Sequence, residues 1–251
     1  MLALMAFLFI GLAIASASEA AEPNLVRVKL TEEGSYSFTV KGNYKLVDQA
    51  TNEVIANLKP GENWLVYLQD GRIAVSRQGG QSRLYKGPVS VQGSGFQVSV
   101  LSGSGKLLDT ADVDDLSVIN GAGKVAPLAG STGKITLKGS QRTETVEDSA
   151  GLSVLSLTTS TGTTRYRGNF EFRVAGDKLM AINILDIEDY LCGVVPCECI
   201  PSWPEEALKA QAVAARNYAL QTMEASRSNG SVFDLVASQY NQVYGGYDAQ
   251  T

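Results

Sequence analysis

The stretch 176-GDKLMAINILDIEDYLCG-193 changes from a strand pattern to a helix pattern within a few residues. Residues 164–185 read as a β-hairpin, because a Gly-Asp pair is a typical two-residue turn between strands. Asp186 then has a side chain suited to a helix N-cap, which predicts a short helix over residues 187–192 that Gly193 ends. The stretch therefore predicts strands followed by helices.

A longer helix is predicted from about Pro204 to Ala225. Ser202 and Glu205 have the spacing of a capping box, and a proline is common in a first helical turn. The alanines of this helix leave little side-chain bulk, so neighbouring backbone can pack close; they are Ala207, Ala210, Ala212, Ala214, Ala215 and Ala219. Two faces stand out, one with Lys209 and Arg216 and another with Gln211, Ala215 and Tyr218. Lys209 and Arg216 also fit an ordinary solvated cationic stripe.

The region before residue 159 is rich in short alternating segments and tight turns. The pair 70-DG-71 between LVYLQ and RIAVS predicts a hairpin, and 42-GN-43 and 60-PG-61 are further turn signals. Residues 102–105 and 120–133 are rich in Gly and Ser and are predicted to be loops. We therefore predict an α+β fold, with a β-rich N-terminal region over residues 24–158. A hairpin and an Ala-rich helix follow, in a second, incomplete catalytic domain over residues 159–251.

The first twenty residues, MLALMAFLFIGLAIASASEA, are almost entirely apolar or small. They predict a signal peptide or an N-terminal membrane anchor, with 15-ASA-17 as a cleavage pattern. The protein is then extracytoplasmic: secreted, associated with the cell wall or anchored in the membrane. The net charge of −5 without a basic cluster argues against a nucleic-acid partner.

The sequence contains no histidine, which excludes Ser-His and Cys-His nucleophiles and every zinc site with a histidine ligand. Three cysteines lie close together around one glutamate, Glu198, in 192-CGVVPCECIP-201. Their C-x4-C-x-C spacing is not a standard zinc pattern, so no metal or other cofactor is predicted. A disulfide between Cys192 and either Cys197 or Cys199, or three plain thiols, remain open alternatives.

The segment 183-NILDIEDYLCGVVPCECIPSWPEEALKAQAVAARNYAL-220 resembles the signature of the stage II sporulation protein D family, which includes the LytB amidase enhancers. The resemblance rests on EDYL-x-GVVP-x-E, SWP and EALKAQAVAAR, with RYRG upstream and QVYGG downstream. It extends over about residues 166–246. It implies an exported lytic transglycosylase that cleaves peptidoglycan glycan strands already stripped of peptides, together with a partner amidase.

The same resemblance implies roles for individual residues. Glu198 takes the position of the catalytic acid, and the substrate-binding positions fall on Lys209, Gln211 and Arg216 in the long helix and Tyr244 near the end. A lytic enzyme needs one acid/base rather than two carboxylates, because an internal hydroxyl of the sugar acts as nucleophile. We expect Glu198 to lie in a partly apolar site formed by nearby side chains: Val194, Val195, Ile200 and Trp203.

The sequence departs from the family at several points. Cys192 replaces a usual tyrosine, and Cys197 and Cys199 flank the catalytic position. The Cys and His zinc ligands that some members carry before QVYGG are absent. Family members continue beyond QVYGG, so we expect the catalytic domain here to be incomplete. Two other functions stay open: a non-catalytic wall-binding module that enhances an N-acetylmuramoyl-L-alanine amidase, and a structural β-rich adhesion module.

Overall fold

The computed structural model describes the chain over residues 25–93 and 153–250. Between these ranges it describes six short strands by their backbone pairing alone, as three antiparallel pairs. These strands are β9 (Phe96–Leu101), β10 (Leu107–Val113), β11 (Ser117–Ile119), β12 (Val125–Pro127), β13 (Lys134–Lys138) and β14 (Thr143–Glu147). β12 lies inside the predicted loop 120–133, so that prediction is wrong there. The predicted export segment 1–20 and the stretch 102–105 lie outside the described residues.

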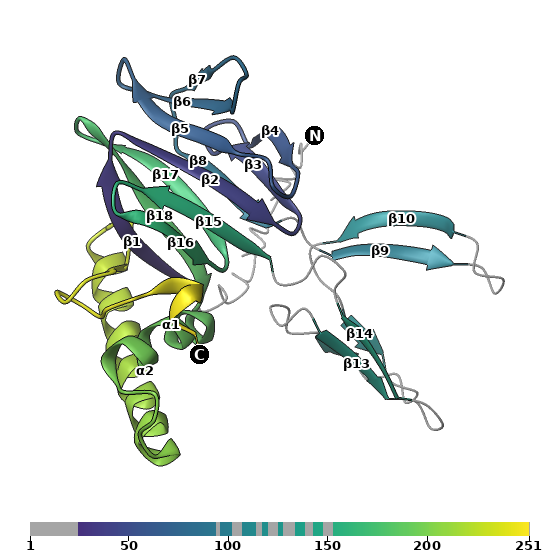
Figure 1. Ribbon diagram of the computed structural model, residues 1–251, viewed down its shortest axis with the longest axis vertical. Coiled ribbons are helices and arrows are strands. Elements are labelled where there is room, and N and C mark those ends of the chain that lie inside the picture. The colour runs from purple at the N-terminus through teal and green to yellow at the C-terminus, as the bar shows by residue number, and fades with distance from the viewer. Residues whose placement is uncertain are drawn as a thin grey trace, which may run out of the picture.

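Two mainly antiparallel sheets form the body of the molecule (Figure 1). The seven-stranded sheet has the order β19 (Leu235–Val236), β1 (Leu25–Glu33), β18 (Lys178–Asp186), β17 (Asn169–Ala175), β8 (Val89–Gly93), β3 (Tyr44–Asp48) and β4 (Glu53–Leu58). The six-stranded sheet has the order β16 (Gly162–Tyr166), β15 (Val154–Thr159), β2 (Ser35–Lys41), β5 (Trp64–Gln69), β6 (Arg72–Arg77) and β7 (Arg83–Tyr85). The α+β prediction with a β-rich N-terminal region is confirmed.

Strand pairing does not follow the predicted boundary at residue 158. β1 pairs with β18, β8 pairs with β17, and β15 pairs with β16, so both sheets mix strands from before and after the boundary. The predicted hairpin 164–185 is also divided: β17 and β18 form it, whereas residues 164–166 belong to β16 in the other sheet. Alternation along each strand defines its two faces, but it does not identify the partner strand.

Tight turns lie where the sequence predicts them. Asp70 and Gly71 both have positive φ between β5 and β6, as a primed two-residue turn requires. The turn at Gly176-Asp177 joins β17 to β18, with Ala175 opposite Lys178.

Apolar side chains from both sheets form the first core. It is rich in aromatic residues: Tyr36, Phe38 and Val66 come from one sheet and Tyr44, Phe170 and Phe172 from the other. The rings of Phe38 and Phe172 stack with centroids 5.9 Å apart.

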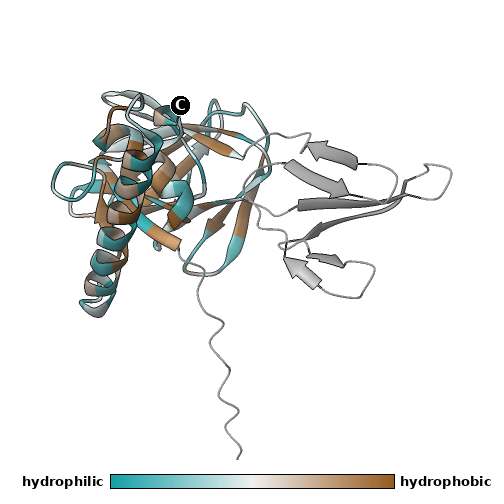
Figure 2. Ribbon diagram, turned by 90° about the horizontal axis from the view of Figure 1, so that it is seen from below, coloured by the Kyte–Doolittle hydropathy of each residue, from teal (hydrophilic) through white to brown (hydrophobic). Residues whose placement is uncertain are grey.

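A second core lies beneath two helices, α1 (Ile187–Glu198) and α2 (Glu205–Ser228), at one end of β1 and β18 (Figure 1). β18 contributes to both cores from one face, since Leu179 lies in the first core and Leu185 in the second. Along α2, hydrophobic and hydrophilic stretches lie side by side (Figure 2). Its buried residues are Ala215, Ala219 and Met223, so small side chains do let α2 pack close.

The predicted capping box at the start of α2 is wrong. The N-cap is Pro204, which has no side chain that could cap the helix, and Ser202 makes no such bond. The side chain of Glu205 instead contacts Lys209 at 2.9 Å, four residues along the helix. Within the described ranges, neither α1 nor α2 is long and apolar enough to cross a membrane.

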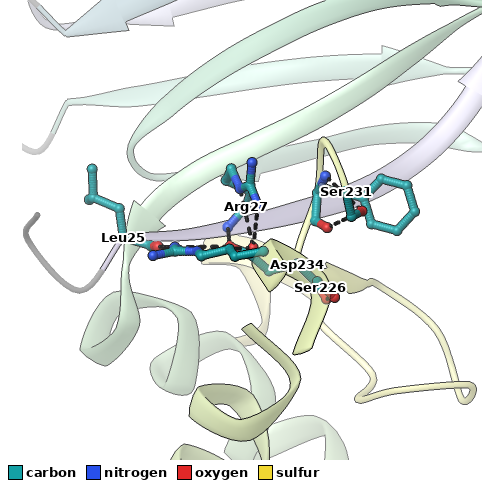
Figure 3. A network of polar contacts seen from close by, with 7 residues as sticks. Leu25, Arg27, Ser226, Ser231 and Asp234 are labelled. Carbon is teal, nitrogen blue, oxygen red and sulfur yellow. Dashed lines mark hydrogen bonds and ion pairs between the residues drawn. The ribbon is translucent and has the colours of Figure 1, made fainter. Parts of the chain in front are cut away.

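A buried aspartate ties the first strand to the end of α2 (Figure 3). Asp234 has a fully buried side chain, accepts hydrogen bonds from the backbone and side chain of Arg27, and also pairs with Arg227. Arg227 donates in turn to the carbonyl of Leu25. Burial opposes ionisation of Asp234, but the bonds from the two arginines prevail and hold the pKa of its carboxyl below the usual value.

Candidate functional site

Helix α1 runs further than the sequence predicts. Asp186 caps it as expected, with its carboxylate 2.7 Å from the backbone nitrogen of Glu188. The helix does not end at Gly193 but continues through Pro196 to Glu198. Gly193 serves close packing instead, because a Cβ there would lie 2.6 Å from the ring of Tyr244. As a result, Glu198 is the last residue of a helix that is packed on the sheet.

Glu198 is exposed, and a backbone amide orients its carboxylate. The N–H of Val243 donates to Oε1 of Glu198 at 2.7 Å. Within the described part of the chain, Oε2 of Glu198 accepts no hydrogen bond and no lysine or arginine pairs with the carboxylate. One oxygen of Glu198 is therefore fixed and the other is available to a ligand.

The other acidic residues of α1 and of the first turn of α2 are all ion-paired. Glu188 pairs with Arg216 at 2.6 Å, and Asp189 pairs with Arg167 at 2.8 Å. Lys209 lies 2.9 Å from Glu205 and 3.0 Å from Glu206. Among the acids of this neighbourhood, Glu198 is thus distinguished by its free oxygen.

The segment that holds Glu198 is 242-QVYGG-246, called the strap below. Gln242 is 7% exposed; its Oε1 accepts a hydrogen bond from the hydroxyl of Tyr190 in α1 at 3.1 Å, and its Nε2 donates to the carbonyl of Ala215 in α2 at 3.4 Å. Further along, the N–H of Gly245 donates to the carbonyl of Gly193 at 3.0 Å. The strap is therefore bonded to both helices.

The glycines of the strap are required by close contacts. A Cβ at Gly245 would lie 2.9 Å from the sulfur of Cys197. Gly246 has a φ of +67°, and a Cβ there would lie 2.5 Å from the carbonyl oxygen of Arg165. A larger residue at Gly245 would move the strap away from α1, and one at Gly246 would move it away from β16.

Within the described residues, none of the four predicted substrate-binding side chains forms a hydrogen bond or ion pair with Glu198. The two cations are bound by nearby carboxylates. The hydrogen bonds that Lys209 donates to Glu205 and Glu206 raise its pKa, and those that Arg216 donates to Glu188 raise its pKa. Gln211 is half-buried and makes no side-chain hydrogen bond within the described residues. Tyr244 is only 6% exposed, and its hydroxyl donates to Oδ1 of Asn183 at 2.9 Å. Tyr244 therefore supports the site from inside.

The apolar surroundings of Glu198 are open on one side. Val194 is buried and Val195 half-buried, but Ile200 is 58% exposed and Trp203 is 47% exposed. Of the four residues expected around Glu198, Val194 of α1 is therefore in the core, Val195 is half-buried, and the other two face solvent.

The three cysteines are unpaired, and Cys192 and Cys197 are exposed while Cys199 is buried. Five residues along a helix separate two Cα atoms by roughly 8–9 Å, beyond the reach of a disulfide, so Cys192 and Cys197 cannot pair while α1 is intact. The thiol of Cys197 donates to the carbonyl of Gly193, and partial burial raises the pKa of both exposed thiols. In the described ranges, no three Cys, Asp or Glu side chains are grouped as metal ligands would be.

Sequence reasoning missed the residues that fasten the strap. Arg165 and Arg167 fit a solvated strand edge, yet both lie over the ring of Tyr247, at 5.1 and 5.3 Å from its centroid. Arg165 also pairs with Asp248 at 2.5 Å, which anchors the 3-10 helix η1 (Gly246–Ala249) to β16. The RYRG and QVYGG motifs are far apart in the sequence, and their spacing does not predict the contact between the two segments.

Comparison with known proteins relates the site to a family. A family model described as Stage II sporulation protein (SpoIID) matches residues 175–251. An uncharacterized protein of Brachyspira hyodysenteriae is 46% identical over 81 residues, which make up 32% of this chain and 22% of that relative. The chain therefore spans about a fifth of the length of the curated relative it matches. No solved structure matches the chain. Residues 175–251, which contain Glu198, both helices and the strap, are therefore similar to the Stage II sporulation protein family.

Proposed function

We propose that this protein is an exported lytic transglycosylase that cleaves peptide-stripped peptidoglycan glycan strands, in sporulation or cell-wall remodelling, with Glu198 as general acid and base. The observation that carries the proposal is the environment of Glu198. Its carboxylate is exposed and fixed through one oxygen, whereas Glu188, Asp189, Glu205 and Glu206 are all held by cations. Similarity to the family supports the sporulation context, and the rest is our proposal.

The chemistry needs only one carboxyl group. Protonated Glu198 donates its proton to the glycosidic oxygen, and the bond between that oxygen and the anomeric carbon breaks. The C6 hydroxyl of the same muramic sugar forms a new bond to the anomeric carbon and gives its proton back to Glu198. The proton count balances and no external nucleophile is needed, since the attacking hydroxyl belongs to the substrate.

The oxygen that carries the proton follows from the hydrogen bond to Val243. Because Oε1 already accepts the Val243 N–H at 2.7 Å, the transferable proton resides on Oε2. A hydrogen bond to one oxygen leaves the other oriented toward solvent, where a glycan strand approaches.

Substrate contacts are proposed for the surface around Glu198. Lys209, Gln211 and Arg216 are candidates to bind sugar oxygens, and the exposed ring of Trp203 offers an apolar face to a sugar. Tyr244 is left out of this set because it is buried. Glycan strands and a cell-wall amidase are the proposed partners, and the extracytoplasmic side of the membrane is the proposed location.

The test is a digest of peptide-free glycan strands with mass-spectrometric detection of 1,6-anhydromuramic ends. This chain and the complete reading frame that contains it are each compared with their Glu198→Gln variants. Glutamine can still accept the Val243 N–H but has no proton to donate. We expect Glu198→Gln to lower the rate by at least about 100-fold. Glu188→Gln, on the same helix, is the control and is expected to retain activity.

A second candidate function is favoured by exposed apolar residues. Large hydrophobic side chains are exposed from α1 to the strap: Ile200, Trp203, Val213, Tyr218, Leu220, Val232, Tyr240 and Val243. Such a surface also suits a non-catalytic module that binds glycan or an N-acetylmuramoyl-L-alanine amidase and enhances that amidase. If no form of the protein produces anhydro ends but the wild type and Glu198→Gln bind glycan equally, the enhancer function replaces the enzyme.

A further inference from the structure

We propose that Gln242 is a positioning residue that sets the direction of the Val243 N–H and through it the orientation of Glu198. The inference rests on the proposed acid/base role of Glu198. It concerns a side chain that lies in the core and cannot contact substrate, because Gln242 is only 7% exposed.

The peptide group between Gln242 and Val243 is the physical link. A peptide group is planar, so the direction of the Val243 N–H depends on the ψ angle of Gln242 and the φ angle of Val243. The residue after Val243 is fixed too, since the hydroxyl of Tyr244 bonds to Asn183 and its ring lies 5.1 Å from that of Tyr190. Anchors on both sides of Val243 therefore leave the N–H one direction, toward Oε1 of Glu198.

The amide of Gln242 spans the two helices that carry the site. Tyr190 in α1 donates to its Oε1, and its Nε2 donates to the carbonyl of Ala215 in α2. Both partners are buried, so loss of either bond leaves a polar group without a partner in the core. Burial also raises the pKa of Tyr190 far enough that its hydroxyl stays a donor at any ordinary pH.

The position of Glu198 makes it dependent on this link. Glu198 is the last residue of α1, and Cys199 after it is already extended, with a φ of −129°. Among the described residues, the N–H of Val243 is the group that donates a hydrogen bond to the carboxylate of Glu198. Without it, the side chain of Glu198 would rotate among several rotamers, and the fraction of molecules with Oε2 toward the glycan would fall.

The first test is kinetic. Gln242→Met keeps the length of the side chain and removes both bonds, and Tyr190→Phe removes only the bond from α1. We expect kcat to fall by about 100-fold in Gln242→Met and about tenfold in Tyr190→Phe, with KM unchanged, since misplacement by about 1 Å can cost that much. The control is Gln239→Met, an exposed glutamine of the same loop, with kcat unchanged.

The second test does not depend on activity. Hydrogen exchange of the Val243 amide is measured in the wild type and in each variant. We expect faster exchange in Gln242→Met and Tyr190→Phe, and wild-type exchange in Gln239→Met. Exchange at the amides of β18 monitors the fold, so a variant that unfolds globally is recognised.

A conservative variant adds a pH signature. Gln242→Glu keeps the acceptor for Tyr190, and only its protonated form can donate to the carbonyl of Ala215. Because burial favours a neutral carboxyl group, the activity of Gln242→Glu relative to wild type should rise as the pH falls. Exchange at the β18 amides is followed over the same pH range, so a recovery that only reflects the stability of the fold is recognised.

The outcomes separate the two proposals. If Glu198→Gln retains full activity, the proposed function fails, whatever Gln242 does. If Glu198→Gln is inactive but Gln242→Met keeps the wild-type kcat and the protection of the Val243 amide, the positioning role of Gln242 is refuted alone.

Discussion

Between the two sheets the core consists of apolar and aromatic side chains, whereas beneath α1 and α2 it also contains polar side chains that are fully bonded. Phe38, Phe170 and Phe172 represent the first kind. Asn183, Asp234 and Gln242 represent the second, and each bonds to two or more segments far apart in sequence. Apolar contacts stabilise without fixing direction, but hydrogen bonds fix both partner and angle. The helical region is therefore the part of the molecule in which geometry is specified, and it holds the candidate site.

The largest loss of stability is expected from breaking the core between the sheets. Phe172 packs against the rings of Tyr36, Phe38 and Phe170. Phe172→Ala should lower the free energy of unfolding by about 4 kcal/mol, because it removes buried area and leaves a cavity. Denaturant unfolding at several pH values should show the same loss at each. Val174→Ala, near the exposed end of the same strand, is the control, and an equal effect there would contradict the interpretation.

A smaller loss, with a different pH dependence, is expected from the helical region. Asp234→Asn removes the charge that Arg27 and Arg227 share, and should lower the free energy of unfolding by about 3 kcal/mol near neutral pH. The pKa of Asp234 is lowered in the folded protein, so its contribution is complete above the usual value of 3.8 and disappears as the pH falls through the folded value. The difference between variant and wild type should therefore shrink in acid, and a constant difference would refute the pairing. Glu224→Gln on the surface of α2 is the control.

Close packing of the strap is tested by Gly193→Ala. The added methyl group would lie 2.6 Å from the ring of Tyr244 and 2.8 Å from the carbonyl oxygen of Gly246. We expect a loss of about 2 kcal/mol from overpacking and a lower kcat from a displaced strap. Gly34→Ala is the matched control, since no atom lies within 4 Å of its added Cβ. If both variants unfold like wild type, the strap is looser than its contacts indicate.

The smallest effect is expected on the surface of the helices. Arg216 holds the pKa of Glu188 below its usual value, yet the Glu188 side chain is 60% exposed. Glu188→Gln should cost less than about 1 kcal/mol, since water and salt screen such a pair. Thermal unfolding at low and at high salt checks this: the difference from wild type should vanish at about 1 M salt. A loss as large as that of Asp234→Asn would remove the distinction between buried and exposed pairs.

Local sequence signals predicted part of the fold well. Asp70-Gly71 and Gly176-Asp177 are turns because their backbone preferences are local, and Asp186 is an N-cap for the same reason. The predictions that Gly193 ends α1 and that Ser202 caps α2 are wrong. A glycine that ends many helices lies here in the middle of one, where Tyr244 packs on it, and a serine spaced for capping is left outside α2. Contacts from distant segments overrode both local preferences.

The candidate site combines a residue that a sequence motif singles out with surroundings that no motif records. Glu198 is predicted from a long continuous motif, and its catalytic role stays a prediction. Its partner Val243 lies 45 residues away and acts through its backbone, which has no residue-specific signature. Lys209 and Arg216 were expected to bind substrate rather than to pair with Glu198, and that role stays a prediction. In the structure they pair with Glu205, Glu206 and Glu188.

By itself the sequence determined the β-rich start, the two helices and the resemblance of residues 175–251 to the family model, and it singled out Glu198 as a candidate. Each of these depends on neighbouring residues, on periodicity or on a continuous motif. Only the tertiary structure decided that β1 pairs with β18, that α1 ends at Glu198, and that the strap lies across both helices with its N–H on that carboxylate. These outcomes depend on burial and hydrogen bonding between segments far apart along the chain, which no local pattern records.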